Sequence, residues 1–294
     1  MISTPNEAPA SKKGSKTSSG KALQFSATQW IFGAENLDTT AARLAGLGYE
    51  GIELAGDPDT YDAKTVRAVL DRYGLTLTSI CGMYPHDRDL SSPDPGVRAN
   101  GVRYIRRCAQ LASELGADIV IVVPGPVGRV TPITTEAEEW ELAVLSIGEA
   151  ADEAAECGVR LAIEALNRYE SYFLRSLQNA ARLALDIDRR NVGLMADLFH
   201  MNIEEADVAA AIRAAGNIVW HVHLADSNRR PPGLGHTDFA GVMAALTEIG
   251  YEGALTMEFM PPTSNPYETA SLDVPAEQKQ ADAKMAIDYL RDLI

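Results

Sequence analysis

The stretch LGYEGIEL (residues 47–54) recurs near the other end of the chain as IGYEGALTME (residues 249–258). In each copy a helical pattern ends just before a glycine, and a short β-like run follows. A glycine at this position is typical of a helix that ends in a left-handed residue. The recurrence therefore indicates a repeated helix–strand unit at both ends of the chain.

The same alternation of β-like runs and amphipathic segments continues between the two copies. Strands are predicted at residues 23–28, 50–54, 76–81, 118–123, 159–164, 192–197, 218–224 and 253–258. Each strand precedes a predicted helix, at residues 37–47, 62–73, 97–115, 136–156, 176–187, 206–214, 239–249 and 277–292. Because these strand–helix units follow one another without a linker, we predict the α/β class. The specific expectation is a closed (β/α)8 barrel, the TIM barrel, over residues 22–294.

Residues 1–21 precede the barrel and have a different composition. They are polar and rich in Lys, Ser, Pro and Gly, without the apolar segment that a secretion signal needs. Such a segment cannot bury enough apolar surface to offset the entropy lost on ordering. We therefore expect a disordered tail there.

The charge balance excludes several classes of partner. The formal net charge is −15, from 41 acidic and 26 basic residues. Such a chain would repel phosphodiester backbones and anionic lipids, so we expect neither a nucleic-acid nor a membrane partner. The sequence also contains no apolar run of about 18 residues, the length that could span a bilayer. Three well-separated cysteines favour free thiols in a reducing compartment, and we expect a cytoplasmic location.

Polar side chains end four successive predicted strands, at Glu164, Asp197, His223 and Glu258. Strand alternation in residues 159–164 places Glu164 on the face that points into the barrel. A single carboxylate at a strand end is more often a solvated residue or a helix cap, but the carboxyl ends of barrel strands converge. Three carboxylates and one imidazole suit a hard or borderline divalent ion such as manganese, magnesium or cobalt. We therefore predict a metal site formed by these four residues.

Other polar residues near these strand ends have simpler interpretations. His221 shares a strand face with His223 and is expected in the core or behind the ligands, not on the ion. Glu204 and Glu205 are expected in the first turn of a helix, where negative charge suits the helix dipole. Asp238 is expected to cap the helix that follows it.

The loops after these strands carry a family resemblance. The four segments are EALNRYES (164–171), DLFHMNIEE (197–205), HVHLADSNRRPPGLGHTDF (221–239) and MEFM (257–260). Together they resemble the signatures of the ketose 3-epimerases, the D-tagatose, D-allulose and L-ribulose 3-epimerase group of the xylose-isomerase-like barrels. The strand-one and strand-four ends, SATQWIFG (26–33) and VVPGPVGRV (122–130), depart from that pattern.

The resemblance implies a cofactor and a set of substrate contacts. It implies one divalent metal ion, Mn²⁺ with Mg²⁺ or Co²⁺ as alternatives, held at the positions that match the family's ligands, which are Glu164, Asp197, His223 and Glu258. It also implies that Glu170, His200 and Arg229 bind the carbonyl end of a ketose.

The implied activity is that of an isomerase of the ketose 3-epimerase type. A ketose has a weakly acidic proton beside its carbonyl, and a metal can stabilise the enediolate that its removal leaves. We predict that Glu164 and Glu258 are the catalytic acid and base on opposite sides of the sugar. The expected partner is a small sugar, and a homodimer or homotetramer is the expected assembly.

Several alternatives start from the same barrel. An isomerase or dehydratase of inositol-derived ketones would begin with the same proton removal. So would a lyase that cleaves the C-glycosidic bond of 3-oxo sugar conjugates, which would add a small heterologous subunit. An apurinic-site endonuclease relative would need three zinc ions and a basic face, which five histidines and an acidic chain disfavour. A sugar-binding barrel without catalysis is the remaining alternative.

Overall fold

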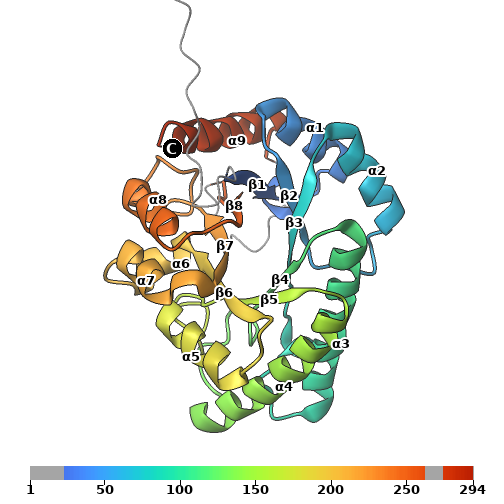
Figure 1. Cartoon of the computed structure of the whole chain (residues 1–294), viewed down its shortest axis with the longest axis vertical. Coiled ribbons are helices and arrows are strands. Elements are labelled where there is room, and N and C mark those ends of the chain that lie inside the picture. The colour runs from blue at the N-terminus through green and yellow to red at the C-terminus, as the bar shows by residue number, and fades with distance from the viewer. Residues whose placement is uncertain (1–22, 262–273, 294) are drawn as a thin grey trace, which may run out of the picture.

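The computed structural model describes residues 23–261 and 274–293, and their strands close into one barrel. Each strand pairs in parallel with the next, and β8 pairs with β1 to complete the ring. Helices surround this ring on the outside (Figure 1). The predicted TIM barrel is thereby confirmed. The predicted tail, residues 1–21, lies outside the described residues.

The observed elements follow the predicted pattern closely. The strands are β1 Gln24–Thr28, β2 Gly51–Ala55, β3 Thr76–Cys81, β4 Ile119–Val122, β5 Arg160–Ile163, β6 Val192–Asp197, β7 Val219–Leu224 and β8 Ala254–Met257. The α-helices are α1 Leu37–Leu47, α2 Ala63–Tyr73, α3 Pro95–Leu115, α4 Glu136–Glu156, α5 Leu177–Ile187, α6 Leu198–Glu204, α7 Val208–Ala215, α8 Phe239–Glu248 and α9 Ala276–Arg291. Three 3₁₀ turns complete the series: η1 Gln29–Phe32, η2 His86–Arg88 and η3 Gly216–Ile218.

Short polar side chains and glycines set the ends of the outer helices. Asn36 begins α1 by accepting a hydrogen bond from the Thr39 backbone N–H, and Asp238 caps α8 in the same way, as predicted. Gly48 ends α1 with φ at 84°, a left-handed conformation that a side chain would disfavour. The glycine in the opening motif therefore has the role that the sequence indicated.

One helix was not predicted. Residues Leu198–Glu204 form α6 directly after β6, because the carboxylate of Asp197 accepts hydrogen bonds from the N–H groups of Phe199 and His200. The prediction for Glu204 and Glu205 was consequently wrong, since they lie at the end of α6 and not in a first turn. Glu204 accepts a hydrogen bond from the backbone N–H of Arg168 instead, and Glu205 accepts one from the first N–H of α5, that of Leu177.

The two faces of the strands have different surroundings, as the alternation predicted. The outward side chains, such as Leu161 and Ile163, belong to the large apolar layer beneath the helices. A smaller apolar cluster fills part of the barrel interior and contains Cys81, Ile119, Ile121, Ala162 and Met195. The three cysteines are free thiols. Among the described helices we find none with the length and apolar character needed to cross a bilayer.

The interior cluster provides a test of the packing. Replacing the fully buried Ile121 by Ala should lower the free energy of unfolding by about 2–5 kcal/mol, because the removed atoms leave a cavity. Leu185→Ala on α5 is the control, since Leu185 is 76% exposed. Its replacement should change the free energy of unfolding by less than about 0.5 kcal/mol. Urea denaturation measures both, and equal losses would contradict the interior placement of Ile121.

Candidate metal and substrate site

The four predicted ligands meet at the carboxyl end of the barrel. Asp197 is the last residue of β6, His223 lies near the end of β7, and Glu164 and Glu258 directly follow β5 and β8. All four are more than nine-tenths buried. Asp197 and His200 form one close group with Glu164, and Asp197 and His223 form another with Glu258. Within each group the candidate ligand atoms lie within 4.8 Å of one another. Because both groups share Asp197, they make one site.

The ring of His223 is oriented by contacts on both edges. Its Nε2 atom lies 3.0 Å from Oε1 of Glu53 on β2. Its Nδ1 atom lies 3.2 Å from Oε1 of Glu258 and 3.7 Å from Oδ2 of Asp197. An ionised carboxylate only accepts, so Nε2 donates its proton to Glu53. In the neutral ring the lone pair on Nδ1 then faces the predicted ligands.

Two buried atoms in this site have electron pairs that no hydrogen-bond donor in the described part of the chain contacts, which favours a cation between them. Oδ2 of Asp197 and Nδ1 of His223 are buried, and neither finds a hydrogen-bond partner among the described residues. Buried polar atoms are rarely left in this state, because their desolvation is then not compensated. A cation between them would satisfy both atoms. The donor set also suits a divalent ion that prefers oxygen and imidazole ligands, so the residues present fit such a metal.

Burial and mutual repulsion perturb the acidic groups of the site. Burial raises the pKa of Glu164 well above its usual value, and the charges of Asp197 and Glu258 raise it further. Burial also raises the pKa of Glu258, although His223 and Arg229 oppose the rise. For His223, burial alone would lower the pKa, but Glu258 and Glu53 raise it well above its usual value. A metal ion entering the site must therefore displace protons.

His200 presents one N–H group to the site. Its Nδ1 atom accepts hydrogen bonds from the backbone N–H of Asn167 at 3.2 Å and from the Asn167 side-chain amide at 2.9 Å. A backbone N–H can only donate, so Nδ1 is unprotonated and the proton of the ring is on Nε2. Nε2 lies 3.7 Å from Oε1 of Glu164. Burial lowers the pKa of His200, which favours this neutral form.

Asn167 also connects His200 to Glu170. The Asn167 amide donates to Oε1 of Glu170 at 2.8 Å. The sequence did not indicate a role for Asn167. One asparagine therefore positions two of the predicted substrate residues.

Arg229 lies across the mouth of the site in an unusual backbone conformation. Its φ is 59°, which few residues other than glycine adopt. The guanidinium lies 3.2 Å from Oε2 of Glu258, 4.0 Å from Glu170 and over the ring of Phe199 at 4.6 Å. It also lies over the ring of Trp30, at 5.9 Å from the centroid. The third predicted substrate residue is therefore also at the site.

Asp226 holds the loop that carries Arg229. Its buried carboxylate accepts hydrogen bonds from four backbone N–H groups of this loop, those of Ser227, Gly233, Gly235 and Thr237. The backbone N–H of Arg229 donates to the Asp226 carbonyl at 2.7 Å. These hydrogen bonds offset the conformational free energy that the left-handed backbone of Arg229 costs.

Glu53 is the site residue that sequence reasoning missed. It lies on β2 between Ile52 and Leu54, whose side chains pack outward, so the same alternation used for Glu164 would have placed it inside the barrel. The sequence contained that signal, but it did not indicate the partner. His221 was correctly expected to stand behind the ligands, since its Nε2 atom contacts Glu53 at 2.9 Å.

Comparison with known proteins extends this description. The chain matches the family described as "Xylose isomerase-like TIM barrel" over residues 41–293. A D-psicose 3-epimerase of Ruminiclostridium cellulolyticum is 33% identical over 224 residues, which cover 74% of this chain and 75% of that protein. A 3-dehydro-D-guloside 4-epimerase of Escherichia coli is 30% identical over 234 residues, which cover 77% of this chain and 88% of that protein. The crystal structure of a D-psicose 3-epimerase with D-tagatose from Clostridium cellulolyticum superposes with a TM-score of 0.84, at 27% identity, covering 92% of this chain and 99% of that one.

The site geometry predicts the effect of removing one ligand. Asp197→Asn should lower the affinity for Mn²⁺ at least about tenfold, because the amide keeps the helix cap but loses the charge. Asp238→Asn is the matched control, since Asp238 caps α8 in the same way and is not one of the predicted ligands. Isothermal titration calorimetry measures both affinities. An unchanged affinity in the Asp197 variant would contradict the ligand role.

The raised pKa values predict a pH dependence. Glu164 and His223 keep protons below their raised pKa values, where protons compete with the metal, and this competition fades as the pH rises. Mn²⁺ should therefore bind more tightly at about pH 8 than at about pH 6, with release of protons. Calorimetry in two buffers of different ionisation enthalpy counts these protons. The same affinity at both pH values, without proton release, would contradict the assignment.

Proposed function

Because the chain belongs to the xylose isomerase-like TIM barrel family, we propose that it is a divalent-metal-dependent ketose 3-epimerase. The observation that carries the proposal is the pair of buried carboxylates, Glu164 and Glu258, beside the two unsatisfied atoms of Asp197 and His223. The similarity to a D-psicose 3-epimerase over about three quarters of both chains supports the same reaction class, an isomerase. Mn²⁺ is the proposed ion, with Mg²⁺ or Co²⁺ as alternatives, because the donor set contains no thiolate.

The proposed reaction is a proton transfer at the carbon next to the carbonyl. One of Glu164 and Glu258 removes this proton, and the other returns a proton to the opposite face, so the configuration at that carbon inverts. Burial raises the pKa of both carboxyl groups, and a bound divalent ion would lower it again, toward the range in which each group can take and return a proton. The bound divalent ion supplies electrostatic stabilisation of the negative charge that develops on the substrate oxygens.

The remaining predicted residues orient the sugar. His200 offers its Nε2–H as a donor to a substrate oxygen, and its tautomer is set in advance by Asn167. Arg229 offers a fixed positive charge beside Glu258. Glu170, which Asn167 orients, accepts a hydrogen bond from a sugar hydroxyl. These groups are positioned before the substrate arrives, which lowers the entropic cost of binding.

A second candidate is an epimerase of oxidised glycosides. The Escherichia coli relative, a 3-dehydro-D-guloside 4-epimerase, shows an identity to this chain close to that of the D-psicose 3-epimerase. In such a substrate the carbonyl is on carbon 3, and the proton next to it is on carbon 4. The same pair of carboxylates could act there, so the contacts to the rest of the sugar decide between the two reactions. The expected homodimer or homotetramer and the cytoplasmic location stay predictions.

The proposal makes a demand on the two carboxylates. Glu164→Gln and Glu258→Gln should each lower epimerisation, and the deuterium incorporation into the epimerised product that accompanies it, by about 10²–10⁴-fold, because inversion needs one carboxylate to take the proton and the other to return one. Proton NMR in D₂O follows the exchange with D-tagatose, D-psicose and a 3-oxo glycoside. Glu204→Gln, which alters a carboxylate paired with Arg168 outside the site, is the control. Epimerisation retained in both site variants would overturn the mechanism.

A further inference from the structure

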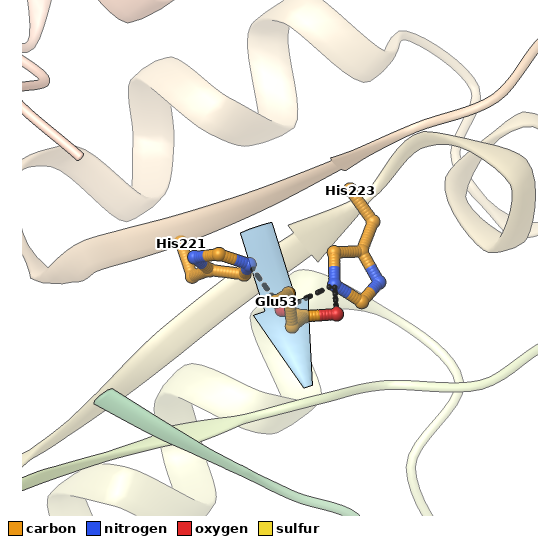
Figure 2. Close-up of side chains that lie close together, drawn as sticks. All are labelled: Glu53, His221 and His223. Carbon is orange, nitrogen blue, oxygen red and sulfur yellow. Dashed lines mark hydrogen bonds and ion pairs between the residues drawn. The ribbon is translucent and has the colours of Figure 1, made fainter. Parts of the chain in front are cut away.

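Glu53 is a fully buried carboxylate inside the barrel, behind the proposed metal ligands. It comes from β2, whereas its histidine partners come from β7, on another part of the ring (Figure 2). Burying a charged carboxylate costs several kcal/mol of folding free energy unless hydrogen-bond donors compensate the lost hydration. The donors around Glu53 therefore indicate its role. The proposed mechanism gives Glu53 no role in proton transfer.

Three donors surround the two oxygens of Glu53. Oε2 accepts from Ser79 Oγ at 2.6 Å and from His221 Nε2 at 2.9 Å. His223 Nε2 lies 3.0 Å from Oε1 and 3.1 Å from Oε2. Figure 2 shows both imidazole rings turned with a nitrogen toward this one carboxylate. Glu53, His221 and His223 also lie close enough together to hold an ion, but their facing atoms are already engaged with one another. This group is a hydrogen-bonded set and not a second metal site.

The contact with Glu53 decides which nitrogen of His223 carries the proton. If the proton moved to Nδ1, Oε1 of Glu258 would lie 3.2 Å away as its acceptor, and the lone pair would point away from the cluster. That tautomer cannot donate electrons to a cation beside Asp197. With Glu53 on the other edge, the proton stays on Nε2 and Nδ1 is available. Glu53 and Glu258 therefore compete for one proton, with opposite consequences for metal binding.

We propose that Glu53 is a positioning residue that fixes the tautomer and orientation of His223, so that Nδ1 faces the metal. The proposal rests on the metal dependence in the proposed function and adds to it the group that makes His223 a ligand. His221 and Ser79 have a supporting part, because they hold the second oxygen of Glu53 and keep the carboxylate from turning.

The first experiment measures metal affinity without any sugar. Glu53→Gln keeps the shape of the side chain but replaces one acceptor by an amide donor, and it should weaken Mn²⁺ binding by about 10–100-fold. Glu139→Gln is the matched control, because Glu139 is also a fully buried carboxylate but pairs with Arg129. It should lower stability without changing the Mn²⁺ affinity. Equal Mn²⁺ affinities for Glu53→Gln and the unaltered chain, with both folded by circular dichroism, would overturn the proposal.

The second experiment uses the unaltered chain, so it holds even where Glu53→Gln does not fold. In protein labelled with ¹⁵N-histidine, Mg²⁺ should shift the Nδ1 resonance of His223 while Nε2 keeps its proton. A shift of Nε2 in place of Nδ1 would overturn the proposal. Neither readout involves turnover, so a chain that binds metal through Nδ1 but epimerises no ketose contradicts only the proposed function.

Discussion

The mutual repulsion of buried carboxylates at one end of the barrel is the constraint on which the rest of the site depends. Glu53, Glu164, Asp197 and Glu258 all lie there with little or no exposure. Burial raises the pKa of Glu164 and Glu258, whereas the neighbouring histidines outweigh burial and lower the pKa of Glu53 and Asp197. The negative charge of these buried carboxylates must be balanced. The structure supplies part of this balance through His223 and Arg229. A divalent cation is the simplest source of the rest.

Several local features serve this balance. Asp197 uses one oxygen to start α6 and leaves the other oxygen facing the cluster. The Asp226 loop stabilises a left-handed Arg229, and this conformation brings the guanidinium to Glu258. Glu53 accepts a hydrogen bond from Nε2–H of His223, on the edge of the ring away from the cluster. The left-handed backbone of Arg229 and the burial of Glu53 each cost local stability, as is common where strain and function coincide.

The loops after β3, β4 and β5 are joined to one another by the contacts of one arginine side chain. Arg129, in the loop after β4, pairs with Asp89 in the loop after β3 and with Glu139 on α4. Its guanidinium also lies over the ring of Tyr172 in the loop after β5. These loops rim the carboxyl end of the barrel, and the segment after β4 departs from the ketose 3-epimerase pattern, whereas the segment after β5 resembles it. One buried arginine therefore connects three loops at the carboxyl end of the barrel.

Periodicity in the sequence determined the barrel and the inward direction of its polar side chains. The predicted strands end within one residue of the observed ones, and the helices within two, because the strand and helix periods are local properties of the chain. The same periodicity brought Glu164, Asp197, His223 and Glu258 to one end. It missed α6, because the polar residues of that segment resemble a loop. Only the closed barrel decided the role of Glu53. Its partner His223 is 170 residues away along the chain. The two side chains meet because the barrel closes and both point into its interior, and no local sequence pattern predicts that contact.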